Sequence, residues 1–320
     1  MIVLSADEIA GLLSVPEVIA AVEAALRAQD LQQCVVPQRH HIEWQGGTFL
    51  SMPAVGMRSV GVKLVAVVPG NAERSLPVTN GLMVINSAAT GVPLAVMNAA
   101  TLTAIRTGAV GALGVKYMTP PESASVGIIG CGVQGTWQAI SACAVRPIKE
   151  VFAIRRSPQG FERFAAALRR QVPAVGVVAC RDADELLKRT DIVIAATTAS
   201  EPVLPDDPAR LQGKHFISVG SYRRNMQEFP DSVYRLAGAL AIDSEGARAE
   251  VGDVVNIVQK GILRSADVFA IAELVLGRRS VDVRRTTAYK TAGNALFDLF
   301  VAEALLAAAT LRGVGTEVAL

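Results

Sequence analysis

Residues 125–135 read SVGIIGCGVQG, and this stretch decides the fold that we expect. The apolar segment Ser125–Ile129 is typical of a buried strand, and it is followed at once by Gly130, Gly132 and Gly135 in the pattern GxGxxG. In such a turn the first glycine permits a tight bend, the second lets the backbone approach a pyrophosphate, and the third lets the following helix pack on the strand. A strand before the pattern and a helix after it favour a dinucleotide site, and a glycine-rich turn in another kind of α/β domain is the alternative.

The helix expected after this turn begins near Val133 and Gln134. A helix N-terminus offers unpaired N–H groups and a partial positive charge to phosphates. We therefore expect Val133 and Gln134 to bind the cofactor together with the three glycines.

The end of the next strand indicates which dinucleotide is bound. The strand expected over Glu150–Ile154 is followed by Arg155, Arg156 and Ser157, so no carboxylate stands where NAD sites place one, about 20 residues after the glycines. Two guanidinium groups and a hydroxyl suit a ribose 2′-phosphate. NADPH is the expected cofactor and NAD the second choice, and a solvated arginine pair on a surface loop is the alternative interpretation.

The chain after residue 120 alternates between apolar strands and helices, which predicts a doubly wound parallel sheet of the Rossmann type. After Ile129 we expect strands at Glu150–Ile154, Gly176–Ala179, Ile192–Ala195, His215–Val219 and Gly238–Ile242, with helices at about 134–144, 160–171 and 182–189. Thr197 follows one of these strands at the edge where ligands collect, so it is either a cofactor contact or an ordinary strand-end residue.

The N-terminal third has a different texture. Ser5 and Ser14 are each followed three residues later by glutamate, which predicts two capped helices. Short apolar runs separated by Gly, Pro and Asn predict antiparallel strands at Gly47–Met52, Val60–Val68 and Gly81–Ser87, with a hairpin turn at Thr90-Gly91 and a helix over Leu102–Tyr117. The tail from Thr287 to Leu311 is expected to form one long helix that packs back on the N-terminal region.

Bulk composition excludes several classes of protein. The 320 residues are 51% hydrophobic and 19% charged with a net charge of +2, which favours a folded protein and gives no electrostatic reason for nucleic acid or a membrane surface as partner. Apolar runs are shorter than the roughly 20 residues of a membrane span. Four scattered cysteines, three histidines without metal-ligand spacing and a start without a basic segment predict a cytoplasmic protein without a metal site.

Several ordered motifs resemble the ornithine cyclodeaminase/mu-crystallin family over nearly the whole chain. They are Gly61–Asn71, Thr90–Ala95, Leu102–Gly108, Ile128–Gln134, Val219-Gly220, Gln227-Glu228, Gly252-Asp253 and Tyr289–Gly293. The resemblance implies a split architecture. Residues 1–117 and 287–320 would form an α+β domain for substrate binding and dimerisation, and residues 118–286 would form an inserted NAD(P)-binding Rossmann domain.

The same resemblance implies roles for individual residues. Arg39, Lys63 and Arg106 match the cations around a substrate carboxylate, and three fixed cations would orient a small anionic imino acid. Without the resemblance, Lys63 is either a ligand-facing group or an edge residue with a solvated tip, and the two arginines are ordinary surface charges. The residues assigned to the cofactor, besides those of the glycine turn and the Arg155 loop, are Thr107, Thr197, Val219, Gly220 and Ser221.

Three departures from the cyclodeaminase pattern indicate a branch of the family. Cyclodeaminases carry an acid where this chain has Ser221, a glutamate where it has Leu50, and an NAD-binding aspartate where it has Arg155. The mu-crystallin-like branch instead reduces cyclic ketimines. We therefore expect reduction of Δ1-pyrroline-2-carboxylate or Δ1-piperideine-2-carboxylate to L-proline or L-pipecolate by a homodimer. Lys63 is the candidate proton donor or electrostatic partner of the imine.

Three rival functions follow from the same residues. A true cyclodeaminase would convert L-ornithine to L-proline and ammonia. An alanine-dehydrogenase-like or imine-condensing enzyme would accept an open-chain 2-oxo acid and an amine. A non-catalytic, NADPH-dependent binder of small ligands would neither release ammonia nor oxidise NADPH.

Overall fold

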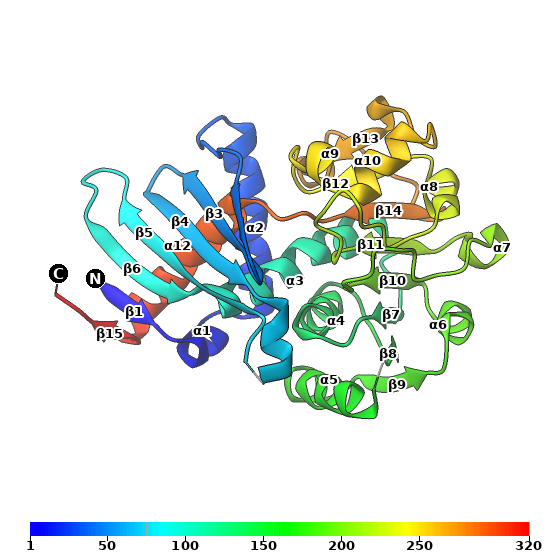
Figure 1. The fold of residues 1–320 in the computed structure, drawn as a ribbon, viewed down its shortest axis with the longest axis horizontal. Coiled ribbons are helices and arrows are strands. Elements are labelled where there is room, and N and C mark those ends of the chain that lie inside the picture. The colour runs from blue at the N-terminus through cyan, green and yellow to red at the C-terminus, as the bar shows by residue number, and fades with distance from the viewer. Residues whose placement is uncertain (75, 156, 320) are drawn as a thin grey trace. The chain divides into compact units, whose positions relative to one another are not determined.

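The computed structural model describes residues 1–74, 76–155 and 157–319, so the predicted site residue Arg156 lies outside the described residues. The chain forms two compact units, which are considered separately (Figure 1). Unit 1 comprises Met1–Arg106 and Asn294–Leu320, and unit 2 comprises Thr107–Gly293. The first boundary falls at Arg106, within a continuous helix, whereas the sequence predicted it at residue 117, near the end of that helix.

Unit 1 is built on a seven-stranded sheet with the order β15-β1-β6-β5-β4-β3-β2. Its strands are β1 (Ile2–Leu4), β2 (His40–Trp44), β3 (Gly47–Val55), β4 (Ser59–Val67), β5 (Thr79–Ser87), β6 (Pro93–Asn98) and β15 (Thr316–Glu317). All neighbours are antiparallel except β1 and β6. The expected strands and the hairpin turn at Thr90-Gly91 are confirmed, while β1, β2, β6 and β15 had not been predicted.

The helices of unit 1 begin where capping residues stand. They are α1 (Ala6–Leu12), α2 (Val15–Asp30), the first part of α3 (Ala99–Met118) and α12 (Ala295–Arg312), with a 3₁₀ turn η1 (Pro69–Arg74). The backbone N–H groups of Ser5 and Ser14 each donate a 2.7 Å hydrogen bond to the carboxylate of the glutamate three residues later. Both predicted helix starts are confirmed, since each capping pair satisfies an N–H that the helix itself leaves unpaired.

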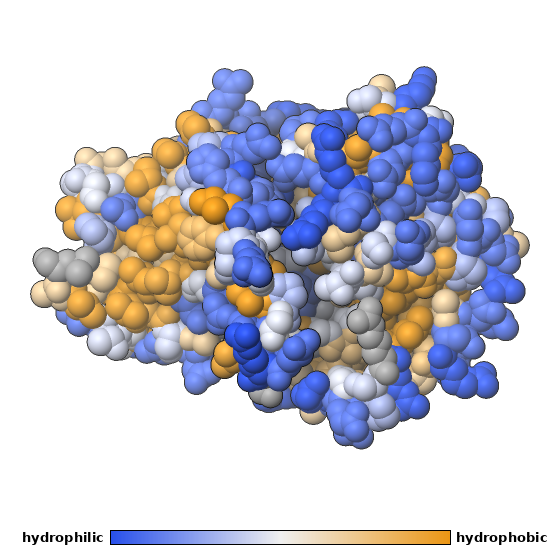
Figure 2. All heavy atoms as spheres, viewed as in Figure 1, coloured by the Kyte–Doolittle hydropathy of each residue, from blue (hydrophilic) through white to orange (hydrophobic). Residues whose placement is uncertain are grey.

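One face of the unit 1 sheet is buried and the other is partly open. Alternate residues of β5 show it: Met83 and Ile85 are buried, while Leu82 is exposed and Val84 is half-buried between them. Helix α12 packs on β3, β4 and β5 and lies behind the sheet in Figure 1. Figure 2 shows hydrophobic side chains gathered on the left, over the region where Figure 1 draws β4, β5 and β6.

Unit 2 contains an eight-stranded sheet in which every neighbouring pair is parallel. Its order is β13-β12-β14-β11-β10-β7-β8-β9. The strands are β7 (Ser125–Ile129), β8 (Glu150–Ile154), β9 (Gly176–Cys180), β10 (Ile192–Ala195), β11 (His215–Ser218), β12 (Leu240–Ile242), β13 (Val268–Ala270) and β14 (Thr287–Lys290). The expected doubly wound parallel sheet is confirmed.

Helices lie on both faces of this sheet. They are the second part of α3, α4 (Val133–Val145), α5 (Pro158–Gln171), α6 (Ala183–Arg189), α7 (Pro208–Leu211), α8 (Asp231–Ala237), α9 (Ala247–Glu250), α10 (Gly252–Gln259) and α11 (Ala272–Val275), with a 3₁₀ turn η2 (Ser265–Asp267). Helix α4 packs on β7 and β10 and α6 packs on β7 and β8, from opposite sides in Figure 1. Strands buried on both faces read as continuous apolar runs, which is why β7, β10 and β11 were recognisable in the sequence.

The prediction of one long helix from Thr287 to Leu311 is wrong at its start. Residues Thr287–Lys290 form β14, which pairs with β11 and β12 inside the parallel sheet. Helix α12 begins only at Ala295, where the side chain of Asn294 accepts a hydrogen bond from the N–H of Leu296. Pairing with two buried strands therefore decides the structure of Thr287–Lys290, and the helical pattern of the residues that follow does not extend to them.

No single helix among the described residues is long and apolar enough to cross a membrane. Helices α1 and α2, which meet at a bend of 88°, are long and apolar enough only when taken together.

Candidate functional site

Each glycine of the GxGxxG turn has a separate structural reason. Gly130 has φ +103°, and a Cβ atom there would lie 2.4 Å from the carbonyl oxygen of Ala196. At Gly135 a Cβ atom would lie 2.0 Å from the carbonyl oxygen of Gly130, so only glycine lets α4 approach the turn. At Gly132 a Cβ atom would meet nothing within 4 Å. The fold itself therefore does not require glycine at this position, whereas a ligand bound close to this backbone would.

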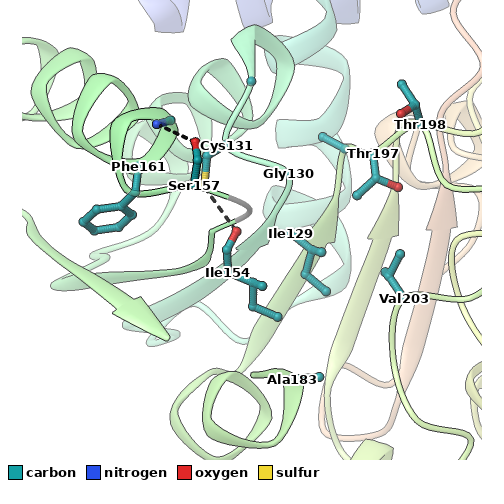
Figure 3. A pocket seen from close by; sticks show the side chains of 13 residues that line it. Ile129, Gly130, Cys131, Ile154, Ser157, Phe161, Ala183, Thr197, Thr198 and Val203 are labelled. Carbon is teal, nitrogen blue, oxygen red and sulfur yellow. Dashed lines mark hydrogen bonds between the residues drawn. The ribbon is translucent and has the colours of Figure 1, made fainter. Parts of the chain in front are cut away.

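A cleft of about 500 Å³ opens at the carboxyl ends of β7, β8 and β10, in front of this turn. Of the residues predicted to bind the cofactor, Gly130, Gly132, Ser157 and Thr197 line it. Figure 3 shows Ile129 and Ile154 in the middle of these lining residues, with Phe161 on the left and Thr198 and Val203 on the right. This is the edge of a doubly wound sheet at which nucleotides bind.

The start of α4 fits the phosphates of a dinucleotide. Its N-cap residue is Gly132, which has no side chain to bond the first N–H groups of the helix. Val133 is exposed, and the buried side-chain oxygen of Gln134 has no hydrogen-bond partner among the described residues. An uncapped helix start beside an open cleft is a site for an anion, so the residues present suit a dinucleotide.

The end of β8 is polar and open. Arg155 is exposed, and Ser157 caps α5 by accepting a 3.1 Å hydrogen bond from the N–H of Gly160. The thiol of Cys131 donates to the carbonyl oxygen of Ile154, as drawn in Figure 3. Neither Arg155 nor Ser157 is a carboxylate, so the group that would bond a ribose 2′-hydroxyl in an NAD site is not supplied by them.

Four predicted cofactor residues meet a carboxylate that the sequence analysis had not assigned a role. Thr197 follows β10, and Val219, Gly220 and Ser221 follow β11; the backbone N–H groups of all four donate to the side chain of Glu228, which is fully buried. Thr107 lies in α3, where its carbonyl oxygen accepts a 2.8 Å bond from Gln138. Glu228 stood within the resemblance as part of Gln227-Glu228, but its target loops could not be seen in the sequence.

Unit 1 holds a second polar cluster, buried beneath its sheet. Lys63 on β4 donates a 2.8 Å hydrogen bond to one carboxylate oxygen of Asp298 on α12, and Arg106 on α3 donates a 2.9 Å bond from Nε to the other. The exposed fraction of the side chains is 2% for Lys63, 7% for Arg106 and 0% for Asp298. The structure therefore brings together two of the three predicted cations through an acid that had not been predicted.

The surroundings of Lys63 change its proton affinity. Burial and the positive charge of Arg106 lower the pKa of Lys63 from 10.5 to about 7, against the opposing effect of Asp298. Arg39, half-buried in the loop before β2, also lowers this pKa, which places its charge within reach of the same cluster. A lysine that titrates near neutral pH is suited to donate a proton to a reacting group.

Lys63 stands in a row of methionines. The strand register sets it opposite Met52 on β3 and Met83 on β5, and Met83 lies opposite Met97 on β6. All three methionines are at most 4% exposed. An ammonium group placed on this apolar face needs a buried counter-charge, and Asp298 supplies it.

Comparisons with known proteins agree with this architecture. A family model described as "Ornithine cyclodeaminase/mu-crystallin family" matches residues 1–310. A Δ1-pyrroline-2-carboxylate reductase of Bacillus cereus is 32% identical over 327 residues, which cover 99% of each chain. The solved structure of Thermococcus litoralis Δ1-pyrroline-2-carboxylate reductase, in complex with NADH and L-proline, has a TM-score of 0.93 at 32% identity and covers 99% of this chain and 100% of its own. An archaeal alanine dehydrogenase dimer with bound NAD has a TM-score of 0.91 at 28% identity, over 100% of this chain and 99% of its own.

Proposed function

We propose that this chain, which belongs to the ornithine cyclodeaminase/mu-crystallin family, reduces the C=N bond of a small cyclic imino acid with a nicotinamide dinucleotide. The substrates proposed are Δ1-pyrroline-2-carboxylate and Δ1-piperideine-2-carboxylate, and the products are L-proline and L-pipecolate. Relatives named as reductases of the first compound, 32% identical over nearly the whole chain, support the choice of substrate class.

The observation that carries the proposal is the buried cluster of Lys63, Arg106 and Asp298. Two cations, Lys63 and Arg106, share the carboxylate of Asp298, so these three groups carry an excess of positive charge when Lys63 is protonated. Arg39 lies close enough to lower the pKa of Lys63. A substrate carboxylate would compensate this excess, and a guanidinium binds it in a fixed orientation.

Lys63 is the proposed proton donor. Reduction of an imine requires a proton on the ring nitrogen, and a lysine whose pKa is about 7 gives one up readily at neutral pH. Asp298 holds the ammonium group in place through its 2.8 Å hydrogen bond. The bound nicotinamide would supply the hydride to the imine carbon.

Cyclodeamination of ornithine is disfavoured, because this chain has Leu50 and Ser221 at the two positions where cyclodeaminases carry acids. Leu50 lies on β3 opposite Val65, and Ser221 donates its hydroxyl to Asp253. The carboxylates beside that loop, Glu228 and Asp253, already accept several hydrogen bonds from the protein. None of these residues is available to handle a substrate amino group.

We extend the proposal to cofactor choice, assembly and location. NADPH is preferred over NADH, because Arg155 and Ser157 at the end of β8 suit a 2′-phosphate; Arg156 was assigned the same role and lies outside the described residues. The protein acts as a homodimer in the cytoplasm. A dimeric relative with a TM-score of 0.91 and the open apolar face of the unit 1 sheet support the assembly.

The test is a spectrophotometric assay at the nicotinamide absorbance, with each cyclic imine and with NADPH or NADH. Imine-dependent oxidation, faster with NADPH, is the expected result. Ammonia release from L-ornithine without cofactor oxidation would show that the protein is a cyclodeaminase and that the proposed reduction is wrong. Oxidation that requires pyruvate and ammonia, and not a cyclic imine, would favour the second candidate, an enzyme like the alanine dehydrogenase to which the chain is 28% identical.

A further inference from the structure

Glu228 joins the two loops that follow β10 and β11. Its Oε1 accepts hydrogen bonds from the backbone N–H of Thr197 at 2.8 Å and from the Thr197 hydroxyl at 2.9 Å. Its Oε2 accepts bonds from the N–H groups of Val219 at 3.0 Å, Gly220 at 2.7 Å and Ser221 at 3.3 Å. Each oxygen of one carboxylate therefore serves a different loop.

The two loops touch directly at Gly220. A Cβ atom on this residue would lie 2.0 Å from the carbonyl oxygen and 2.4 Å from the nitrogen of Thr197, and 2.6 Å from Oε1 of Glu228. The backbone of one loop thus packs on the backbone of the other, with the carboxylate beside the contact. Because peptide N–H groups from both loops point at Glu228, removing it would leave buried donors unpaired and free the loops to separate.

A second set of buried groups stands behind this carboxylate. Asp253 on α10 accepts bonds from the N–H of Glu228 at 3.1 Å, from the hydroxyl of Tyr234 at 2.5 Å and from the hydroxyl of Ser221. The hydroxyl of Ser218 donates to Glu228 at 2.8 Å. Burial raises the pKa of Glu228, and the positive charge of nearby Lys290 opposes that rise. The carboxylate is held in one position by groups that do not face the cleft.

We propose that Glu228 is a positioning residue for the dinucleotide, acting through the loops that carry Thr197 and Gly220. Thr197 lines the cleft, and both loops lie at the carboxyl edge of the sheet where the cofactor binds in this fold. The inference rests on the proposed function, because it presupposes that the cleft binds a nicotinamide dinucleotide.

The substitution Glu228→Gln keeps the size of the side chain and removes its charge and one of its two acceptor oxygens. A glutamine side chain has the same shape but one acceptor oxygen, and its NH₂ group would face N–H donors of whichever loop lost its partner. One loop therefore stays fixed and the other does not. The matched control is Tyr234→Phe, which removes the buried hydrogen bond that the Tyr234 hydroxyl donates to Asp253 and leaves Glu228 unchanged.

The experiment is a fluorescence titration of full-length variants with NADPH and NADH, together with urea denaturation and steady-state kinetics. Both substitutions should lower stability. Only Glu228→Gln should raise the dinucleotide Kd, by about tenfold, because one of the two loops loses its fixed position. Its KM for the dinucleotide should rise and its kcat fall, while its KM for the imine stays unchanged. Where this variant does not fold, Glu228→Asp, which keeps the charge but is one methylene shorter, should shift the Kd in the same direction.

Three results would be decisive against the inference or its premise. An unchanged Kd and kcat in the folded Glu228 variant would overturn the positioning role. An equal rise in Kd for Glu228→Gln and Tyr234→Phe would do the same, because it would show general loosening of unit 2. Failure of the unsubstituted protein to bind either dinucleotide would instead overturn the proposed function.

Discussion

Lys63 carries an amine that is buried in the middle of an antiparallel strand, which is rare for a lysine. Its pKa is lowered from 10.5 to about 7, with burial as the largest cause. In the unfolded chain the same amine keeps its ordinary high pKa. Folding and protonation of this residue are therefore linked between about pH 7 and pH 10.5.

The linkage has a definite sign. Below about pH 7 Lys63 is protonated in both the folded and the unfolded state, so it does not make the free energy of unfolding depend on pH. Between about pH 7 and pH 10.5 the unfolded state binds one proton more than the folded state, so the free energy of unfolding rises with pH. Lys63→Met should lack this component of the rise. Urea denaturation of both proteins across this range checks the prediction, and parallel pH dependences would contradict it.

Asp298 should be the costliest single residue to alter in unit 1. Asp298→Asn leaves Lys63 and Arg106 as buried cations without a full counter-charge, which typically costs about 3–5 kcal/mol. It should also lower the pKa of Lys63 further, since Asp298 raises it in the intact protein. Chemical denaturation measures the first effect. The pair of Glu245 with Arg248 provides the control. The Glu245 side chain is 68% exposed, so Glu245→Gln should leave the denaturation midpoint nearly unchanged.

The turn between β7 and α4 makes a prediction at the scale of an element. Gly132→Ala adds a Cβ atom in open space, so the protein should fold with a loss of no more than about 1 kcal/mol at this N-cap, while its dinucleotide Kd rises strongly. Gly135→Ala adds a Cβ atom 2.0 Å from a carbonyl oxygen, so this variant should lose stability instead. Thermal denaturation beside cofactor titration separates the two. Equal cofactor binding by Gly132→Ala and the unsubstituted protein would refute the assignment of the turn.

Elements with local signals could be predicted from the sequence. Ser5 and Ser14 mark helix starts through partners three residues away, and the turn at Gly130 lies between an apolar strand and a helix. Strand β14 could not be predicted, because its pairing partners β11 and β12 lie far away in the sequence. Its end is nonetheless visible afterwards in Gly293, with φ +80°, and in the N-cap Asn294.

The candidate sites divide in the same way. The glycine turn could be predicted because the residues that form it are consecutive in the sequence. Asp298 was missed because it bonds to Lys63, which lies 235 positions away in the sequence. The sequence around an isolated acid in an apolar helix does not show which residue the acid pairs with. A useful signal did exist: Asp298 is an acid with two phenylalanines within two positions of it, and a charge in such a run has to be paired when the helix is buried.

At the scale of the whole molecule, the open face of the unit 1 sheet predicts assembly. Pro53, Val62, Val84 and Val96 form a row across β3, β4, β5 and β6 by register, and Leu82 beside them is 50% exposed. Leu82→Asp should convert the proposed homodimer to a monomer, because a charge within an apolar interface is costly to desolvate. Light scattering after size exclusion measures the mass. Leu311→Asp, at an 87% exposed position near the end of α12, is the control and should not change it.

The two ends of the chain meet in one sheet. Strand β1 pairs with β15, residue Ile2 lies opposite Glu317, and the N-terminal amine donates to the carbonyl oxygen of Val318. The two end segments of the described chain therefore lie side by side. A short linker could join its ends, and new ends could be cut at the exposed turn around Thr90 without breaking a strand. For the same reason, a fusion partner attached at either terminus would occupy the same place on unit 1.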